Sequence, residues 1–125
     1  KYRIVALGNL APNTWSKNDC FAPVLSQFEL RLLVAIATQK KCIPKTGDVA
    51  QAFCQSTLPP GENYICRPPA GCPITKNEVY WKLKKTLYGL KRSPRHFYDL
   101  AKKTLLSIGF TVHPSSPCLF IGHLI

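Results

Sequence analysis

Apolar residues recur at helical spacing in two long segments of the chain. In residues 26–41 one helix face gathers Phe28, Leu32, Ala35 and Ile36. Ser26 followed by Glu29 has the spacing of a capping box, in which hydroxyl and carboxylate each accept a backbone N–H. In residues 93–109 one face gathers Phe97, Leu100, Ala101, Leu105 and Ile108. Ser93 suits an N-cap, Pro94 the first helical position, and Gly109 the residue past the C-terminus. The pattern therefore predicts two main helices.

Shorter apolar segments have the character of strands. They are YRIVALG near the N-terminus, the stretch around Asp48, NYICR, EVYWKLKK and the closing CLFIG. In EVYWKLKK apolar and basic residues alternate, which is typical of a half-buried strand. Residues 9–20 are polar and contain Pro12, so we expect a loop there. Strands and helices mix without strict alternation, which favours the α+β class.

Composition and charge narrow the possible partners. The 125 residues are 46% hydrophobic and carry a formal net charge of +11, so we expect a folded, polyanion-binding chain. No apolar run approaches the roughly 18 residues of a membrane span, and the N-terminus does not resemble a signal peptide. Six cysteines lie mostly in apolar surroundings without a CxxC pair. Buried free thiols are favoured, with disulfides and metal ligation as alternatives.

Basic residues concentrate in one part of the sequence. Residues 82–103 hold eight of the seventeen lysines and arginines, with aromatic residues interleaved and Asp99 as the only acid. Basic side chains suit phosphates and flat rings suit sugars or bases, so this pattern favours a nucleic-acid track. The alternative is a solvated charged face whose aromatic rings pack inward.

Asp48 is a lone carboxylate in the apolar stretch GDVAQAF. A buried carboxylate needs compensation, because its desolvation is costly. A basic partner, a helix N-terminus, water at a surface or a metal ion could each provide it. The residues alone leave these four alternatives open.

Five blocks in order carry a resemblance to a known family. They are KYRIVALGN, DCFAPVLSQFELRLLVAIA, GDVAQAF, LPPGENYICRPPAG and YWKLKKTLYGLKRSPRHFYDLAKKTLLSIGF, and the segment PCLFI follows them. Together they resemble the N-terminal fingers and palm part of the reverse transcriptase of copia-type (Pseudoviridae-like) retrotransposons. The resemblance implies a partial right-hand polymerase fold, with a mixed, mostly antiparallel sheet packed by two main helices. It also implies that residues 1–125 are an N-terminal fragment that stops before the Tyr-x-Asp-Asp hairpin of the family.

The resemblance also implies roles for individual residues. Asp48 matches the catalytic aspartate that binds Mg²⁺, with the backbone carbonyl of Val49 as a further ligand. The residues that match nucleotide contacts are Lys1, Arg3, Phe53, Tyr88 and Gly89. Those expected near nucleic acid are Lys84, Lys85, Lys91, Arg92 and Arg95, although the family often has glutamine in place of Arg92.

The implied function is RNA-directed DNA synthesis by two-metal catalysis in the complete domain. The implied partners are an RNA or DNA template with primer, deoxynucleotide triphosphates and the rest of a polymerase polyprotein, without a membrane. The implied location is intracellular, in the cytoplasm or in virus-like particles. Because two of three catalytic aspartates are absent, we expect this chain alone to be inactive. The alternatives are a non-catalytic basic nucleic-acid-binding remnant and a secreted, disulfide-stapled basic protein.

Overall fold

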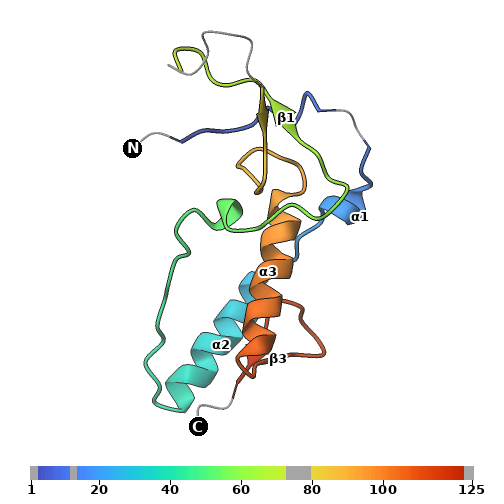
Figure 1. Cartoon of the computed structure of the whole chain (residues 1–125). Helices are drawn as coiled ribbons and strands as arrows, with labels where there is room; N and C mark the ends of the chain where they lie inside the picture. The colour runs from blue at the N-terminus through green and yellow to red at the C-terminus, as the bar shows by residue number, and fades with distance from the viewer. Residues whose placement is uncertain (1–2, 12–13, 73–79, 123–125) are drawn as a thin grey trace. The chain divides into compact units, whose positions relative to one another are not determined.

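The two predicted helices are the main regular elements of the computed structural model, which describes residues 3–11, 14–72 and 80–122. Helix α2 spans Gln27–Gln39 and helix α3 spans Ser93–Ser107 (Figure 1). The capping box of α2 is confirmed, because the Ser26 hydroxyl accepts from the Glu29 N–H and the Glu29 carboxylate accepts from the Ser26 N–H. Gly109 follows α3 with φ of 93°, a conformation that glycine adopts without strain.

Ser93 has a different role from the one its position predicts. Helix α3 begins at Ser93 itself, and the Ser93 hydroxyl donates to the carbonyl oxygen of Leu87 at 2.6 Å. The side chain is nearly fully buried, so this bond ties the start of the helix to the preceding turn. Ser93 was expected to cap the helix, but its hydroxyl instead joins the first residue of α3 to Leu87 in the preceding turn.

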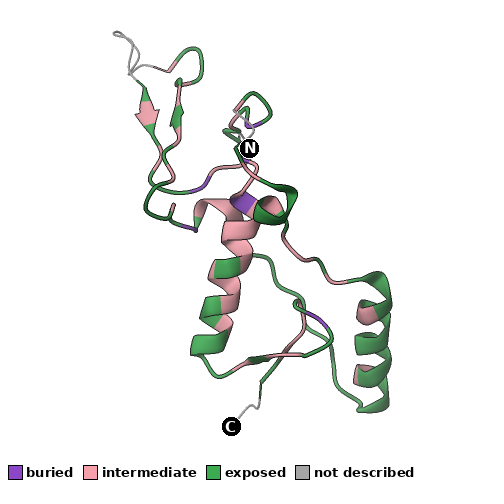
Figure 2. Ribbon diagram, turned by 90° about the vertical axis from the view of Figure 1, so that its right-hand side faces the viewer, coloured by how far each residue is buried: buried purple, intermediate pink, exposed green. Residues whose placement is uncertain are grey.

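The chain divides into two compact units. Unit 1 consists of Lys1–Phe21 and Gln51–Leu100, and unit 2 consists of Ala22–Ala50 and Ala101–Ile125. Among the described residues, the buried positions of unit 1 are Gly8, Ser56, Thr86, Leu90 and Ser93. Figure 2 shows a buried position where α3 begins. The core of unit 1 thus combines one leucine with small hydroxyl side chains.

Unit 1 contains a short antiparallel ladder and two small helical pieces. Strand β1 (Ile65–Cys66) pairs with strand β2 (Trp81–Lys82), in the register Ile65 with Lys82 and Cys66 with Trp81. Helix α1 (Lys17–Cys20) lies within residues 9–20, which the sequence predicted to be a loop. Its capping box, Ser16 with Asp19, is a local signal that could have located it. The 3₁₀ helix η1 spans Ala52–Cys54.

Unit 2 combines α2 with a second antiparallel ladder. Strand β3 (Thr111–Val112) pairs with strand β4 (Phe120–Ile121), in the register Thr111 with Ile121 and Val112 with Phe120. The closing strand was predicted, whereas β3 was not. Most of α2 is exposed (Figure 2), including Phe28 at 75%. This helix therefore presents apolar surface of the kind that usually meets another surface.

The predicted single mixed sheet is wrong in the described parts of the chain, where two separate two-stranded antiparallel sheets occur instead. No strand forms over residues 3–7, where the Ala6 N–H donates to the Tyr88 carbonyl oxygen as a single bond at 2.7 Å. No strand forms around Asp48 either, and Val49 leads into a turn and η1. A strand needs a partner for its backbone groups, and apolar composition alone does not supply one.

The cysteines are free, as the sequence favoured, but they are not buried. All six lack a disulfide. Cys42 is exposed and the other five are half-buried. The prediction of free thiols is confirmed. The prediction that the thiols are buried is wrong, because many of the apolar residues that surround the cysteines in sequence are themselves exposed.

Glu29 should make unit 2 sensitive to acid. Hydrogen bonds from the side chain of Ser116 and from Ser26 lower the pKa of Glu29 from its ordinary 4.5 to about 2. A carboxylate whose pKa is lower in the folded state contributes stability above its unfolded pKa. We therefore expect this contribution to be complete above about pH 4.5 and to disappear as the pH falls toward 2.

The measurement compares the wild type with Glu29→Gln by urea unfolding, followed by far-ultraviolet circular dichroism between pH 7 and pH 2. The wild type should be the more stable protein at pH 7, and the difference should shrink within that acidic window. A difference that stays constant down to pH 2 would contradict the assignment.

Candidate functional site

Three residues predicted to contact the nucleotide lie together in unit 1. The guanidinium of Arg3 lies 4.6 Å from the centroid of the Tyr88 ring. The Phe53 ring is tilted against Tyr88 at a centroid distance of 5.1 Å, and it meets Phe97 edge-on at 6.2 Å. We call Arg3, Phe53, Tyr88 and Phe97 the Tyr88 cluster. A cation above a group of tilted and edge-on aromatic rings is a surface that suits an anionic ligand with a flat or apolar part.

Thr86 fixes Phe53 beside Tyr88. The Thr86 side chain is almost fully buried, and its hydroxyl donates to the carbonyl oxygens of Phe53 and Ser56. The Thr86 N–H also donates to the Ser56 carbonyl oxygen at 2.9 Å. These bonds join η1 to the segment before Tyr88 across about thirty residues of sequence. Nothing local in the sequence identified Thr86, because a threonine after two lysines carries no signal of such a contact.

Gly89 permits a close approach of two backbone segments in unit 1, where its neighbour is the N-terminal segment. The contact with nucleotide and template that the resemblance implies for Gly89 stays a prediction. Gly89 has φ of 90°, and an added Cβ would collide with the carbonyl oxygen of Ala6 and lie 2.8 Å from Cγ1 of Val5. The backbone of the N-terminal segment and the backbone at Gly89, the residue after Tyr88, therefore lie in direct contact. Lys1, the remaining predicted nucleotide contact, lies outside the described residues.

Glu62 forms the centre of a buried ion cluster. Its side chain is 5% exposed, pairs with Arg92, and lies 3.0 Å from Nε2 of His96. The Tyr64 hydroxyl donates to the same carboxylate at 3.5 Å. Burial, together with the negative charge of Glu62, raises the pKa of Tyr64. We call Glu62, Tyr64, Arg92 and His96 the Glu62 cluster; it ties the proline-rich loop to the start of α3.

Arg92 is held within the protein, although the sequence placed it near nucleic acid. Its guanidinium lies 4.2 Å above the Trp15 ring, and its Nε donates to the carbonyl oxygen of Asp19 at 3.3 Å. With the Glu62 pair, one side chain joins three segments of unit 1. Its own side chain is 18% exposed. This geometry makes Arg92 a structural residue first, and contact with nucleic acid stays a prediction.

The other predicted nucleic-acid residues differ in their availability. Arg95 pairs with Asp99 at 3.0 Å, and Lys91 is half-buried beside a cavity. Lys84 and Lys85 are exposed and form no ion pair with any described residue. Lys82 of β2, two positions before Lys84, is also exposed. Of the five residues expected near nucleic acid, Lys84 and Lys85 are therefore the two that are exposed and form no ion pair with a described residue.

Asp48 lies at the surface of unit 2. Asp48 is exposed and forms no ion pair with the described part of the chain, and Val49 is 53% exposed. Because Asp48 is exposed to solvent, its charge needs no buried partner, and its role as a metal ligand stays a prediction. Over residues 3–11, 14–72 and 80–122, no group of three histidine, cysteine or acidic side chains could hold a metal ion. No described helix is both long and apolar enough to cross a membrane.

Comparison with known proteins identifies the family. A sequence model described as "Reverse transcriptase (RNA-dependent DNA polymerase)" matches residues 1–123. The chain is 32% identical over 121 residues to the retrovirus-related Pol polyprotein from transposon RE1 of Arabidopsis thaliana, and 31% identical to that from transposon RE2. It is 27% identical to the Pol polyprotein from transposon TNT 1-94 of Nicotiana tabacum.

These matches cover nearly all of this chain and little of the relatives. They include 97%, 97% and 96% of the chain, but only 8%, 8% and 9% of the three polyproteins. No solved structure matches the chain. The match over residues 1–123 agrees with the order of the sequence blocks and with the mixed helices and antiparallel strands described above. The chain belongs to the reverse transcriptase (RNA-dependent DNA polymerase) family, in the form found in retrotransposon Pol polyproteins.

Proposed function

We propose that this chain supplies the nucleotide-facing and template-facing part of an RNA-directed DNA polymerase with a right-hand fingers and palm fold. The observation that carries the proposal is the grouping of Arg3, Phe53 and Tyr88 in unit 1. These residues are distant in sequence, and each matches a nucleotide-contact position of the family. In the proposed role Arg3 meets the triphosphate of a deoxynucleotide, and the Phe53 ring excludes a 2′ hydroxyl.

Asp48 fits a divalent metal ion as one ligand of several. Reverse transcriptases use divalent metal ions, and Mg²⁺ is usually held by one or two carboxylates with water and substrate phosphates. The Asp48 carboxylate is exposed and unpaired within the described residues, and the Val49 carbonyl follows it. The remaining protein ligands would come from a Tyr-x-Asp-Asp hairpin. When bound, the metal would supply charge stabilisation for nucleotidyl transfer. Asp48 itself would orient the ion toward the primer terminus.

The proposed macromolecular partner is a template–primer duplex, in the cytoplasm or in virus-like particles, with the rest of the polyprotein providing the remaining catalytic groups. The exposed lysines before Thr86 support this partner, because unpaired cations release counterions when they meet phosphates. A second candidate function is metal-independent binding of nucleic acid without catalysis. The exposed lysines before Thr86 support that alternative as well, because their contacts with phosphates need no metal ion.

The salt dependence of binding to template–primer should decrease when Lys84 and Lys85 lose their charge. Replacing both with glutamine should reduce the slope of log affinity against log salt concentration by about one to two units, because each lost phosphate contact removes about 0.9. The slope is measured by fluorescence anisotropy with a labelled RNA–DNA duplex between low and moderate salt. Replacing Arg92 with glutamine should leave the slope nearly unchanged, since Glu62 already takes its charge.

The matched control is the pair Lys40→Gln and Lys41→Gln, which removes the same charge from exposed positions of unit 2. If the two double variants give the same slope, the lysines act only through net charge, and the proposed track is wrong. Binding that is retained without Mg²⁺, together with no incorporation by a chain that carries the missing hairpin, would favour the second candidate function.

A further inference from the structure

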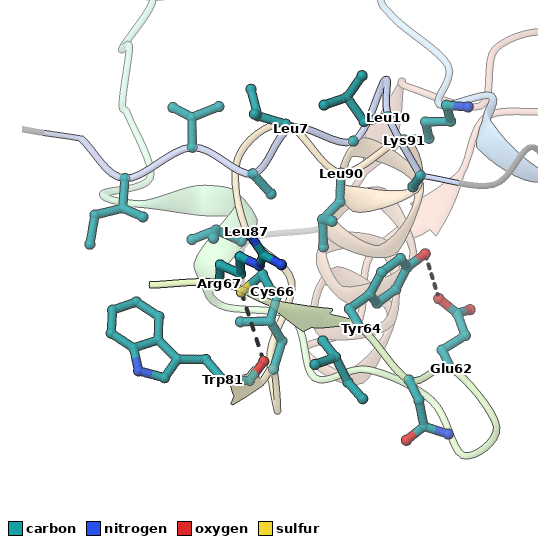
Figure 3. Close-up of a pocket in the computed structure, with 18 of the residues that line it drawn as sticks. Leu7, Leu10, Glu62, Tyr64, Cys66, Arg67, Trp81, Leu87, Leu90 and Lys91 are labelled. Atoms are coloured by element: carbon teal, nitrogen blue, oxygen red, sulfur yellow. Dashed lines mark hydrogen bonds between the residues drawn. The ribbon is translucent and has the colours of Figure 1, made fainter. Parts of the chain in front are cut away.

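Unit 1 contains a cavity that takes no part in the proposed polymerase chemistry. Its volume is about 860 Å³, which lies within the range of pockets that hold small ligands. It is lined by the N-terminal segment, by the β1 and β2 region and by the turn before α3 (Figure 3). None of Arg3, Phe53, Tyr88 or Gly89 lines it. The cavity is therefore distinct from the residues that match nucleotide contacts.

The lining is dominated by aromatic and aliphatic side chains. Trp15, Tyr64 and Trp81 contribute rings, and Leu83 and Leu90 contribute aliphatic surface. Two of the backbone and hydroxyl groups at the cavity are already occupied: the Trp81 carbonyl oxygen accepts from Cys66, and the Tyr64 hydroxyl donates to Glu62 (Figure 3). A lining dominated by rings and aliphatic side chains favours a flat and mostly apolar occupant.

The charges at the cavity favour an anion. Glu62 is the only acidic residue of the lining, and Arg92 and His96 take its two carboxylate oxygens. The lining also holds two cationic residues, Arg67 and Lys91. Arg67 is exposed and has no ion pair with the described residues, and its guanidinium lies 5.9 Å from the centroid of the Tyr80 ring. The positive charge of Arg67 is thus free to meet an anionic group of a ligand.

We propose that this cavity binds a flat, mostly apolar molecule that carries one anionic group, with its rings among Trp15, Tyr64 and Trp81 and its anion at Arg67. A nucleoside triphosphate does not have this chemistry, because it carries several negative charges and a polar base. The proposed ligand would therefore bind independently of the polymerase substrates.

The chain offers its own reporter for this test. Trp15 and Trp81 are the only two tryptophans of the protein, and both line the cavity. Anilinonaphthalene sulfonate, a flat aromatic anion, serves as the probe for the full chain. We expect one bound molecule per chain, with quenching of tryptophan emission and energy transfer to the probe. The uncharged analogue N-phenylnaphthylamine should bind as well, which reports that the aromatic cavity is present.

Arg67→Gln should weaken binding of the anionic probe about five- to tenfold, the effect of about one hydrogen-bonded charge contact. It should change binding of the neutral probe less than about twofold. Lys45→Gln is the matched control, because it removes an exposed positive charge from unit 2. The proposal is overturned if Arg67→Gln and Lys45→Gln weaken the anionic probe equally, or if Arg67→Gln also abolishes binding of the neutral probe. It is also overturned if several probe molecules bind per chain or if dATP displaces the probe.

Discussion

Replacing Glu62 with glutamine is expected to destabilise unit 1 by about 3 kcal/mol, the lower end of the cost of removing one partner from a buried ion pair. The Glu62 side chain is 5% exposed, and both Arg92 and His96 would lose their carboxylate. Glutamine has nearly the same shape, so the loss would report charge and not packing. We expect the lower end because Arg92 would keep its contacts with Trp15 and with the Asp19 carbonyl oxygen.

Urea unfolding followed by tryptophan fluorescence measures this loss in the full chain. Both tryptophans belong to unit 1, and Trp15 lies directly under the Arg92 guanidinium, so the signal follows the segments that Arg92 joins. Asp99→Asn is the matched control. It also removes a carboxylate from an arginine, but the Arg95 and Asp99 side chains are 38% and 50% exposed. An exposed pair of this kind should contribute no more than about 0.5 kcal/mol.

A double variant separates the ion pair from a general loss of stability. With Glu62→Gln already present, Arg92→Gln should cost less than it does in the wild type, because the charge it removes has no partner left. The difference between the two costs is the coupling free energy, expected at about 1 to 2 kcal/mol for residues in one network. If Glu62→Gln proves as mild as Asp99→Asn, or if the coupling is zero, the Glu62 cluster does not hold the proline-rich loop to α3.

Features coded by neighbouring residues could be predicted from the sequence. The Ser26 and Glu29 capping box locates the start of α2, because both partners lie within one helical turn. Gly109 locates the end of α3 for a similar reason. Helix α1 has an equivalent signal in Ser16 and Asp19, but its four residues carry no helical apolar pattern. Local chemistry therefore predicts where helices begin and end better than whether a short one exists.

Features that depend on distant partners could not be predicted. The segments at 3–7 and around Asp48 have apolar composition like that of strands, yet a strand forms only where a second segment offers its backbone. The Glu62 cluster has the same origin, since Glu62 and Arg92 are thirty residues apart and each looks like a solvated surface charge in sequence. The net charge of +11 suggested that the arginines face nucleic acid. Arg92 instead forms an ion pair with Glu62 of the proline-rich loop.

For the candidate site, the family motif predicted individual residues that the composition could not identify. Tyr88 and Phe53 were predicted as nucleotide contacts because of the blocks LYGLKRSPR and DVAQAF. In the structure the centroids of the two rings lie 5.1 Å apart. No period or spacing could have paired them. The contact depends on Thr86, whose hydroxyl reaches the Phe53 carbonyl oxygen, and the motif gave no indication of that residue's role. Sequence resemblance thus named the residues, and long-range hydrogen bonds explain their position.

Replacing Asp48 with asparagine is expected to leave the stability of the chain unchanged within about 0.5 kcal/mol, the usual range for a surface substitution. Asp48 is exposed and forms no ion pair with the described residues, so no buried partner is left without its counter-charge. A structural ion pair at this position would instead give a loss of about 3 to 5 kcal/mol. Urea unfolding followed by circular dichroism distinguishes the two cases, because Asp48 belongs to unit 2, which contains α2.

The same substitution should abolish primer extension in a longer chain that continues through a Tyr-x-Asp-Asp hairpin. Loss of one metal-binding carboxylate removes several kcal/mol of transition-state stabilisation, and about 4 kcal/mol corresponds to a thousandfold lower rate. Primer extension on an RNA template in Mg²⁺ measures this rate. Asp99→Asn is the control for a lost acidic charge, and it should retain nearly full activity because Asp99 is exposed and, among the described residues, forms an ion pair with Arg95 alone. Full activity of Asp48→Asn in the longer chain would make Asp48 an ordinary surface residue. Equal loss in both variants would mean that net charge, and not a metal ligand, had changed the rate.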